Sequence, residues 1–426
     1  MSRPGAGLTR RRLGIAAGGA ALAGLGFSGC ATPTAGAGTG GAAGAARPWP
    51  FLIGADVTWL PEDEALGATY WRDGVQRDAL AILRDAGFNA IKLRLFVDPA
   101  RGYSQGKVGG PWGSIASTIA FARRIREAGL HLSLTLHYSD TWADPEHQEK
   151  PAAWATLPLP GLVDAVYRHT ADALGQMAAA GVAPDLVVIG NEITFGMLWP
   201  EGRIAPAVPT GNPVTDARHR NAALPGGHDR LAALLKAGIA AARGHAPGAK
   251  VVLHNHLGRH WEIVRDWMDN LLERDVRFDA AGFSAYQQLA QGDWEHSFDQ
   301  FVRRYPDHGF LVLEYSSRKR YVNDLVFAHP QGWGSYIWEP IRHQEAIFTR
   351  EGVNAGGGPR PDLLAQGANA AEAPGAAAPL PASVPAEPQF EHPGGRYDAI
   401  PELLALYRAM ARDYGLTPGE PFRPAW

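Results

Sequence analysis

From residue 49 onwards, short apolar runs alternate with longer segments in which apolar side chains recur every three or four positions. Short apolar runs predict buried strands, and the helical spacing predicts amphipathic helices, so the alternation is typical of repeated strand–helix units. Eight strands are expected, at residues 51–57, 90–96, 130–138, 186–192, 250–256, 281–286, 310–315 and 334–339. Eight units without a second break in the pattern favour a closed (β/α)8 barrel, the TIM barrel, over an open sheet.

The helical pattern is clearest between the third and fourth of these strands, where Leu162, Val166, Ala173, Leu174 and Met177 recur at helical spacing. Further helices are expected at residues 228–243, at 321–327, where the pattern is short, and at 400–414. The barrel therefore forms one domain, residues 49–418.

One segment interrupts this domain. Residues 355–388 are rich in Ala, Pro and Gly and cannot supply the apolar face that a packed helix or strand needs. We interpret residues 353–395 as a low-complexity insert between the last strand and the final helix.

The first thirty residues read as an export signal. Paired arginines precede an apolar run at residues 15–27 that is too short to span a bilayer as a stable helix. Cys30, the single cysteine of the chain, follows Phe27-Ser28-Gly29, which resembles the lipobox of bacterial lipoproteins. Residues 31–48 are mostly Gly and Ala and predict a flexible tether. The sequence thus predicts an exported protein at the periplasm or cell surface, which contacts the membrane through a lipid on Cys30; the alternative is a free thiol.

Net charge and composition limit the kinds of partner that the protein is expected to bind. A formal net charge of -3 and a pI of about 6.6 leave no broad basic field for nucleic acid, so we expect none to bind. Thirteen Trp and twelve Tyr offer flat apolar faces on which sugar rings stack, although core packing accounts for most of them. We therefore expect a weakly charged or neutral substrate. We also expect the protein to be a monomer.

The catalytic sites of TIM barrels lie at the C-terminal ends of the strands. Glu192 and Glu314 end the fourth and seventh predicted strands. Hydrolysis of a glycosidic bond needs one protonated and one ionised carboxyl group, and burial with mutual repulsion would separate the pKa values of two such glutamates. The alternative is that either glutamate forms an ion pair that closes the barrel, for example with Arg94. Other polar or aromatic residues share these strand ends: Asp56, Arg94, His137, Asn191, His254, Tyr286, Trp338 and Glu339.

Two long motifs make the comparison more specific. Residues 137–145, His-Tyr-Ser-Asp-Thr-Trp-Ala-Asp-Pro, continue to Gln148 and to Lys-Pro-Ala-Ala-Trp at 150–154, and residues 190–194 and 196–202 read Gly-Asn-Glu-Ile-Thr and Gly-Met-Leu-Trp-Pro-Glu-Gly. They resemble the third- and fourth-strand motifs of glycoside hydrolase family 53, the arabinogalactan endo-β-1,4-galactanases, in clan A of the retaining glycosidases. The resemblance covers residues 51–340 approximately and is strongest before Gly202.

This resemblance implies a role for each residue. Glu192 would be the general acid/base and Glu314 the nucleophile of a retaining cleavage of β-1,4-galactan. Asn191 would bind the 2-hydroxyl of the sugar, while Arg94 and Tyr286 would keep the nucleophile ionised and oriented. His137, Asp140 and His254 would bind sugar hydroxyl groups, with packing at the barrel top as the alternative for His254, and Trp338 would be a stacking platform. Asp56 and Trp142 are further candidates for substrate binding or for support of the site.

Departures from the family pattern keep alternatives open. The end of the sixth strand reads Ser284-Ala-Tyr-Gln-Gln288 without the expected aromatic and proline run, and Tyr315-Ser-Ser317 replaces the usual Thr-Ala after Glu314. A clan A β-glycanase acting on mannan, glucan or substituted galactan is one alternative, and a non-catalytic glycan-binding lipoprotein is another.

A metal hydrolase is a third alternative, because His254 and His256 offer two imidazoles; no carboxylate is adjacent to them. The loop at residues 318–320 is basic and lacks oxygen ligands, so we expect no calcium. Two carboxyl groups supply acid, base and nucleophile, and no cofactor or metal is expected.

Overall fold

The computed structural model describes residues 46–286, 292–342, 345–350 and 394–422. Cys30, the predicted export signal, most of the tether and residues 353–393 of the predicted insert lie outside the described residues. Within the described residues, no helix combines the length and apolar character needed to cross a membrane.

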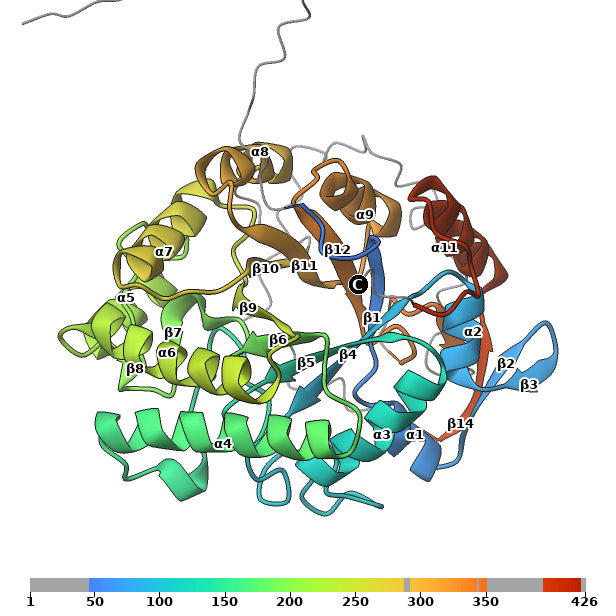
Figure 1. Ribbon diagram of the computed structural model, residues 1–426, viewed down its shortest axis with the longest axis horizontal. Coiled ribbons are helices and arrows are strands. Elements are labelled where there is room, and N and C mark those ends of the chain that lie inside the picture. Colours follow the sequence, from blue (N-terminus) through green and yellow to red (C-terminus); the bar gives the residue numbers. More distant parts are fainter. Residues whose placement is uncertain (1–45, 287–291, 343–344, 351–393, 423–426) are drawn as a thin grey trace, which may run out of the picture. The chain divides into compact units, whose positions relative to one another are not determined.

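In the described residues, eight parallel strands close into a barrel, in the order β1-β12-β11-β10-β9-β6-β5-β4 (Figure 1). The strands are β1 (Leu52–Asp56), β4 (Ala90–Leu95), β5 (His131–Leu136), β6 (Leu186–Ile189), β9 (Lys250–Asn255), β10 (Ala280–Ala285), β11 (Gly309–Tyr315) and β12 (Gly332–Trp338). The predicted TIM barrel is confirmed, with each predicted strand in place.

A helix follows each strand and covers the outside of the barrel (Figure 1). These helices are α2 (Ala79–Asp85), α3 (Ile115–Glu127), α4 (Leu159–Ala179), α6 (Gly227–His245), α7 (Trp261–Glu273), α8 (Trp294–Arg304), α9 (Lys319–Phe327) and α11 (Pro401–Asp413). Side-chain caps fix several helix starts, since Asp78, Ser114 and Asp293 each accept a backbone N–H of the first turn. The four predicted helical segments are confirmed.

Apolar side chains fill the interior of the barrel beneath the polar groups at the C-terminal ends of its strands. Leu52, Val188, Leu313 and Tyr336 belong to one buried cluster between the strands. Gly54 is required there, because a Cβ atom at this position would lie 2.2 Å from the ring of Tyr336. The barrel is therefore a packed core below the polar groups at its C-terminal end.

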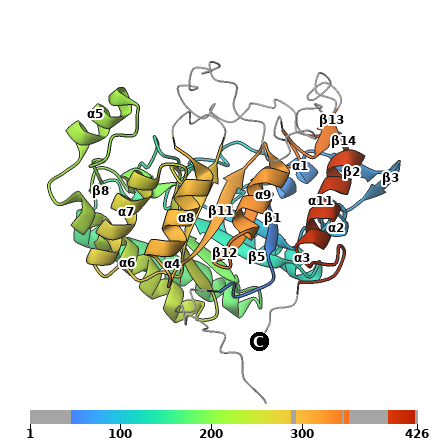
Figure 2. The same ribbon diagram turned by 90° about the horizontal axis from the view of Figure 1, so that it is seen from above.

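A second sheet of four strands was not predicted. Its order is β13 (Phe348–Arg350), β14 (Gly395–Ala399), β2 (Ala68–Arg72) and β3 (Val75–Arg77). A short helix, α1 (Leu60–Ala65), precedes β2. Figure 2 shows β13 and β14 at the same edge of the barrel as α5 (Pro213–Ala222), which lies between β6 and α6 in the chain. Segments that follow barrel strands thus extend the C-terminal face.

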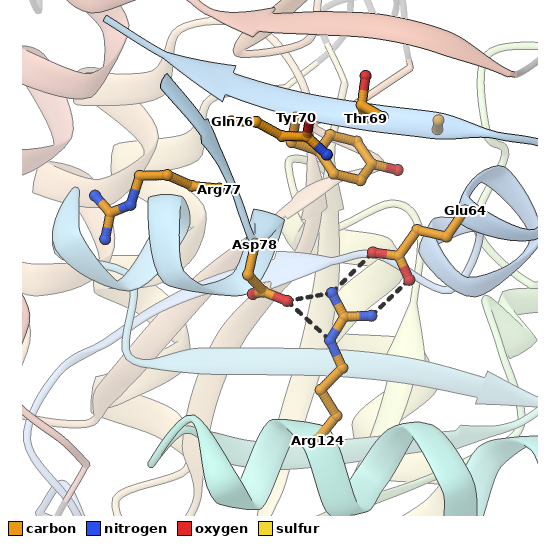
Figure 3. Close-up of a pocket in the computed structure, with 8 residues that line it drawn as sticks. Glu64, Thr69, Tyr70, Gln76, Arg77, Asp78 and Arg124 are labelled. Atoms are coloured by element: carbon orange, nitrogen blue, oxygen red, sulfur yellow. Dashed lines mark hydrogen bonds and ion pairs between the residues drawn. The ribbon is translucent and has the colours of Figure 1, made fainter. Parts of the chain in front are cut away.

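A pocket of about 600 Å³ lies beside this second sheet (Figure 3). Arg124 of α3 crosses it and donates to Glu64 of α1, with Nη2 2.8 Å from Oε1, and to Asp78, with Nε 3.1 Å from Oδ2. These contacts join α1, α2 and α3, and they pair both carboxylates of the pocket with one guanidinium. None of the predicted site residues lines this pocket, so it is distinct from the strand-end site.

Candidate active site

Strand alternation explains why the site residues meet. Every second position of a strand faces the inside of the barrel. On β1 these positions are Leu52, Gly54 and Asp56, and on β4 they are Ala90, Lys92 and Arg94. Each inward-facing position near a strand end therefore adds a polar group to one buried layer. The inward residues Asp56, Lys92, Arg94, His137, His254 and Ser284 are all at most 2% exposed.

Glu192 reaches this layer through a sharp turn. The strand was predicted to run to residue 192, but β6 ends at Ile189. The chain turns because Gly190 and Glu192 both adopt positive φ, 79° and 49°, before a short 3-10 helix, Ile193–Phe195. Left-handed backbone at a non-glycine residue is costly and is typical of functional sites. Glu192 is 6% exposed, and its Oε1 is in hydrogen-bond contact with Ser284 Oγ.

Glu314 lies on β11 beside Ser284, its register partner on β10. Tyr286 donates its phenolic O–H to Glu314 Oε2 at 2.8 Å. Lys92 Nζ lies 3.1 Å from Glu314 Oε1. Ser284 thus neighbours both glutamates, and the predicted pair comes together in one buried site.

The two glutamates have opposite pKa shifts. Burial raises the pKa of Glu192 well above its usual value, and repulsion from Glu314 adds to this effect. Burial also opposes ionisation of Glu314, but Lys92 and Arg94, with hydrogen bonds from Tyr286 and Lys92, outweigh it and lower the pKa of Glu314. These shifts favour the protonated form of Glu192 and the ionised form of Glu314, which is the combination that acid-assisted displacement needs.

The cation that contacts Glu314 was not among the predicted site residues. Arg94 was predicted to hold the nucleophile, but its Nη2 lies 2.6 Å from Asp56 Oδ2 and its Nη1 3.4 Å from Glu339 Oε1. Lys92, one inward position earlier, makes the direct contact, and its Nζ also lies 3.1 Å from Asp56 Oδ2. Asp56 therefore contacts both cations, and through Lys92 it is linked to Glu314.

Glu339 belongs to the same ionic layer. Its Oε1 accepts the backbone N–H of Trp59 at 3.3 Å, in addition to the contact with Arg94. Burial raises the pKa of Glu339 well above its usual value, although Arg94 opposes this shift. Glu339 thus closes the layer on the β12 side.

Aromatic side chains form a cluster against Arg94. Trp142 and Trp338 are half-buried and pack with the buried side chains of Trp59, Phe96 and Tyr103. The guanidinium carbon of Arg94 lies 4.2 Å from the ring centre of Trp142 and 5.6 Å from that of Trp338. Two tryptophans predicted from distant segments therefore lie together at the edge of the ionic layer.

His137 is a neutral imidazole in this layer. Its Nδ1 accepts the backbone N–H of Ala143 at 2.9 Å, so its proton lies on Nε2. Burial, reinforced by Arg94 and Lys92, lowers the pKa of His137 well below its usual value. Nε2 has no hydrogen-bond partner among the described residues, which leaves it as a donor.

Asp140 makes its hydrogen bonds to the backbone of the segments that follow β4 and β5. Its Oδ1 accepts the N–H of Asp98 at 3.0 Å and its Oδ2 that of Ala152 at 2.9 Å. These bonds tie the segment after β5 to the segment after β4. The predicted contact of Asp140 with a sugar hydroxyl stays a prediction.

Asn191 and His254 contact each other. Asn191 donates from Nδ2 to the carbonyl of Ala143 at 2.8 Å, and its Oδ1 lies 3.2 Å from His254 Nδ1. His254 Nε2 lies 3.0 Å from Ser284 Oγ. His256, by contrast, bonds Thr194, so the two imidazoles have separate partners. The described residues contain no group of three His, Cys, Asp or Glu side chains that could hold a metal ion.

Sequence reasoning missed Lys92, Ser284 and Asp144. Two cations within one buried barrel strand, Lys92 and Arg94, are themselves a signal, because an unpaired buried cation is too costly to keep. Asp144 accepts from His147 Nδ1, which lies 2.8 Å from Oδ2, and burial raises the pKa of Asp144. Ser284 carries no such signal, since a serine on a strand is common.

A TIM barrel with a protonated and an ionised glutamate at its C-terminal face has the construction of a glycoside hydrolase. Comparison with known proteins agrees. The profile of glycosyl hydrolase family 53 matches residues 52–324, and the chain belongs to that family.

Relatives extend this comparison. The chain is 37% identical over 238 residues to an uncharacterized protein in the bgaB 5' region of Niallia circulans, with 55% of this chain and 59% of that protein covered. The chain thus spans less than two thirds of that relative. It is 32% identical over 325 residues to the probable arabinogalactan endo-beta-1,4-galactanase A of Aspergillus terreus, with 67% of this chain and 84% of that protein covered.

Solved structures show the same similarity. The Ignisphaera aggregans GH53 catalytic domain is 26% identical, with a TM-score of 0.63, and the match covers 85% of this chain and 96% of that one. A structure from a study of two fungal beta-1,4-galactanases is 25% identical, with a TM-score of 0.58, and the match covers 68% of this chain and 89% of that one.

Proposed function

We propose that the protein is a retaining endo-hydrolase of β-1,4-galactosidic linkages in galactan and type I arabinogalactan. The observation that carries the proposal is the buried pair of Glu192 and Glu314, which both neighbour Ser284 and have opposite pKa shifts. Membership of family 53 and the galactanase names of relatives support the substrate.

Catalysis would proceed in two displacements. In the first, ionised Glu314 attacks the anomeric carbon while Glu192 donates its proton to the leaving oxygen, and a covalent glycosyl-enzyme forms. In the second, Glu192 takes a proton from water, and the water oxygen displaces Glu314 from the sugar. Lys92 and Tyr286, which contact the two oxygens of Glu314, would hold it ionised and aimed until the bond forms.

Other residues of the site would bind the sugar. Asn191 uses one Nδ2 hydrogen for Ala143, which leaves the second for the 2-hydroxyl of the sugar. His137 would donate from Nε2 to another hydroxyl. Trp338 and Trp142 would offer ring faces for stacking beside the cleavage point.

Product analysis tests this proposal. The full chain is incubated with linear β-1,4-galactan and, in parallel, with mannan, β-glucan and xylan, with Glu314→Gln as the blank. Galacto-oligosaccharides from the wild type alone, released first as β-anomers by proton NMR, are expected. Products from another glycan would move the specificity elsewhere in clan A, and α-anomers released first would refute the retaining mechanism. No product from any glycan would favour the non-catalytic glycan-binding protein.

We also propose that the protein is exported and held at the membrane by a lipid on Cys30. The lipobox-like sequence before Cys30, after paired arginines and a short apolar run, supports this. In bacterial cells, Cys30→Ser is expected to move the protein from the membrane fraction to the soluble fraction. Labelled palmitate should enter the wild type and not the variant; a wild type that never takes up the label would contradict the anchor.

A further inference from the structure

Ser284 joins the acid/base glutamate to a chain of buried hydrogen bonds. Its Oγ contacts Glu192 Oε1 on one side and lies 3.0 Å from His254 Nε2 on the other. His254 Nδ1 in turn lies 3.2 Å from Asn191 Oδ1, and Asn191 Nδ2 donates to the carbonyl of Ala143 at 2.8 Å. Asn191, Glu192, His254 and Ser284 are all at most 6% exposed, so water does not compete freely for these groups.

The donor–acceptor direction of this chain of hydrogen bonds is set at its end, the backbone carbonyl of Ala143. A backbone carbonyl can only accept, so the amide nitrogen of Asn191 must face Ala143 and its oxygen must face His254. Nδ1 of His254 therefore carries a proton. Burial, reinforced by Lys92 and Arg94, lowers the pKa of His254 well below its usual value, so the imidazole is neutral and Nε2 has a lone pair.

The lone pair on His254 Nε2 decides the orientation of the serine. A hydroxyl group has a single proton to donate, and the donor that His254 Nε2 needs is Ser284. Ser284 Oγ then presents only lone pairs to Glu192. A protonated Glu192 can donate its O–H to these lone pairs, whereas an ionised Glu192 would require the serine proton to turn away and leave Nε2 unpaired.

We propose that Ser284 is a positioning residue that keeps Glu192 protonated and aimed by accepting the hydrogen bond from its O–H. This inference rests on the proposed role of Glu192 as acid/base. After Glu192 gives its proton to the leaving group, the serine must reorient, and the pull of His254 on the serine proton favours reprotonation of Glu192.

Charged groups also face Glu192 from the neighbouring segments. Glu314 on β11 and Asp144 after β5 raise the pKa of Glu192, and Lys92 on β4 lowers it. Substitution of Ser284 or of neutral His254 changes none of these charges. A shift in the pKa of Glu192 in such variants therefore reports on the hydrogen-bond chain.

Ser284→Ala tests the direction through the sign of that shift. If the serine accepts from Glu192, its loss removes a bond to the protonated form, and the pKa of Glu192 is expected to fall by about one pH unit. If the serine donates to ionised Glu192, its loss raises the pKa. A rise or an unchanged value would overturn the proposal.

The pKa is measured by ¹³C NMR titration of the full chain with glutamate labelled at the carboxyl carbon, and Glu192→Gln assigns the signal. This titration needs no turnover, so an error in the proposed substrate would not affect it. Ser284→Thr and Ser284→Val form a matched pair of similar shape, of which only threonine keeps the hydroxyl. Threonine should retain the wild-type value and valine should show the fall; the same value in both would overturn the proposal.

His254→Ala tests the direction of the hydrogen-bond chain a second time, again through the sign of the shift in the pKa of Glu192. Without the imidazole, the serine proton is released to donate to ionised Glu192, so the pKa of Glu192 should fall here as well. If His254 instead donates to the serine, its loss weakens the donation from serine to Glu192 and raises the pKa. Thermal unfolding of each variant confirms that the titrated protein is folded.

Discussion

Glu314→Ala is expected to lower kcat on linear β-1,4-galactan by about 10⁴-fold or more, because it removes the proposed nucleophile. Its neighbours strengthen this expectation. Lys92 and Tyr286 each bond one oxygen of Glu314, and the carboxyl group of Glu192 holds its proton. The raised pKa therefore disfavours attack by Glu192 in its place.

Azide should restore turnover of this variant on an aryl β-galacto-oligosaccharide. The small anion fits the space left by the carboxylate and attacks the anomeric carbon from the same side, so a glycosyl azide of inverted, α configuration is the expected product. The matched control is Glu295→Ala, which removes an exposed glutamate from α8. Wild-type activity in Glu314→Ala would exclude Glu314 from the mechanism, and a β-azide would contradict its place opposite the acid.

The barrel could be predicted because its strands are buried on both faces. Such strands are short apolar runs, and helices with one apolar face separate them, so each unit can be recognised from its own residues. The second sheet could not be recognised in this way. In that sheet β2 pairs with β14, and Tyr70 faces Tyr397 across more than three hundred residues of chain. No local pattern indicates a partner at that distance.

The site was predictable to the extent that strand ends are predictable. Glu192 and Glu314 follow from their positions at the ends of apolar runs, and the resemblance to family 53 implies the roles proposed for them. The sequence does not show which of Lys92 and Arg94 contacts Glu314. Both point inward from β4, and a rise of one inward position decides that Lys92 meets Glu314 while Arg94 meets Glu339. The positive φ of Glu192, which sets the direction of its carboxyl group, is equally invisible in the sequence.

Lys92→Met is the second substitution with a large expected effect. Methionine approximates the length of the lysine but removes the charge that faces both Glu314 and Asp56. With burial no longer offset by Lys92, the pKa of Glu314 should rise. The acid limb of the kcat/KM profile should then move to higher pH by at least one unit, and kcat/KM at acidic pH should fall by about 10-fold or more.

The same substitution should change the pH dependence of stability. In the wild type, the lowered pKa of Glu314 means that its ionised form stabilises the fold above the pKa of the unfolded chain. That contribution is lost as the pH falls through the lower folded-state pKa. In Lys92→Met, a Glu314 pKa above that of the unfolded chain reverses the sign, so the variant should lose stability as the pH rises between those two values. Urea unfolding across this range measures the change.

Lys319→Met separates the electrostatic role from the general cost of removing a buried lysine. Lys319 is 1% exposed, and its Nζ donates to the carbonyls of Ser316 and Glu345. Its loss should destabilise the fold without moving the acid limb of the kcat/KM profile. If Lys92→Met and Lys319→Met leave the acid limb at the same pH, Lys92 acts as a packing residue, and the low pKa of Glu314 must come from Arg94 and Tyr286.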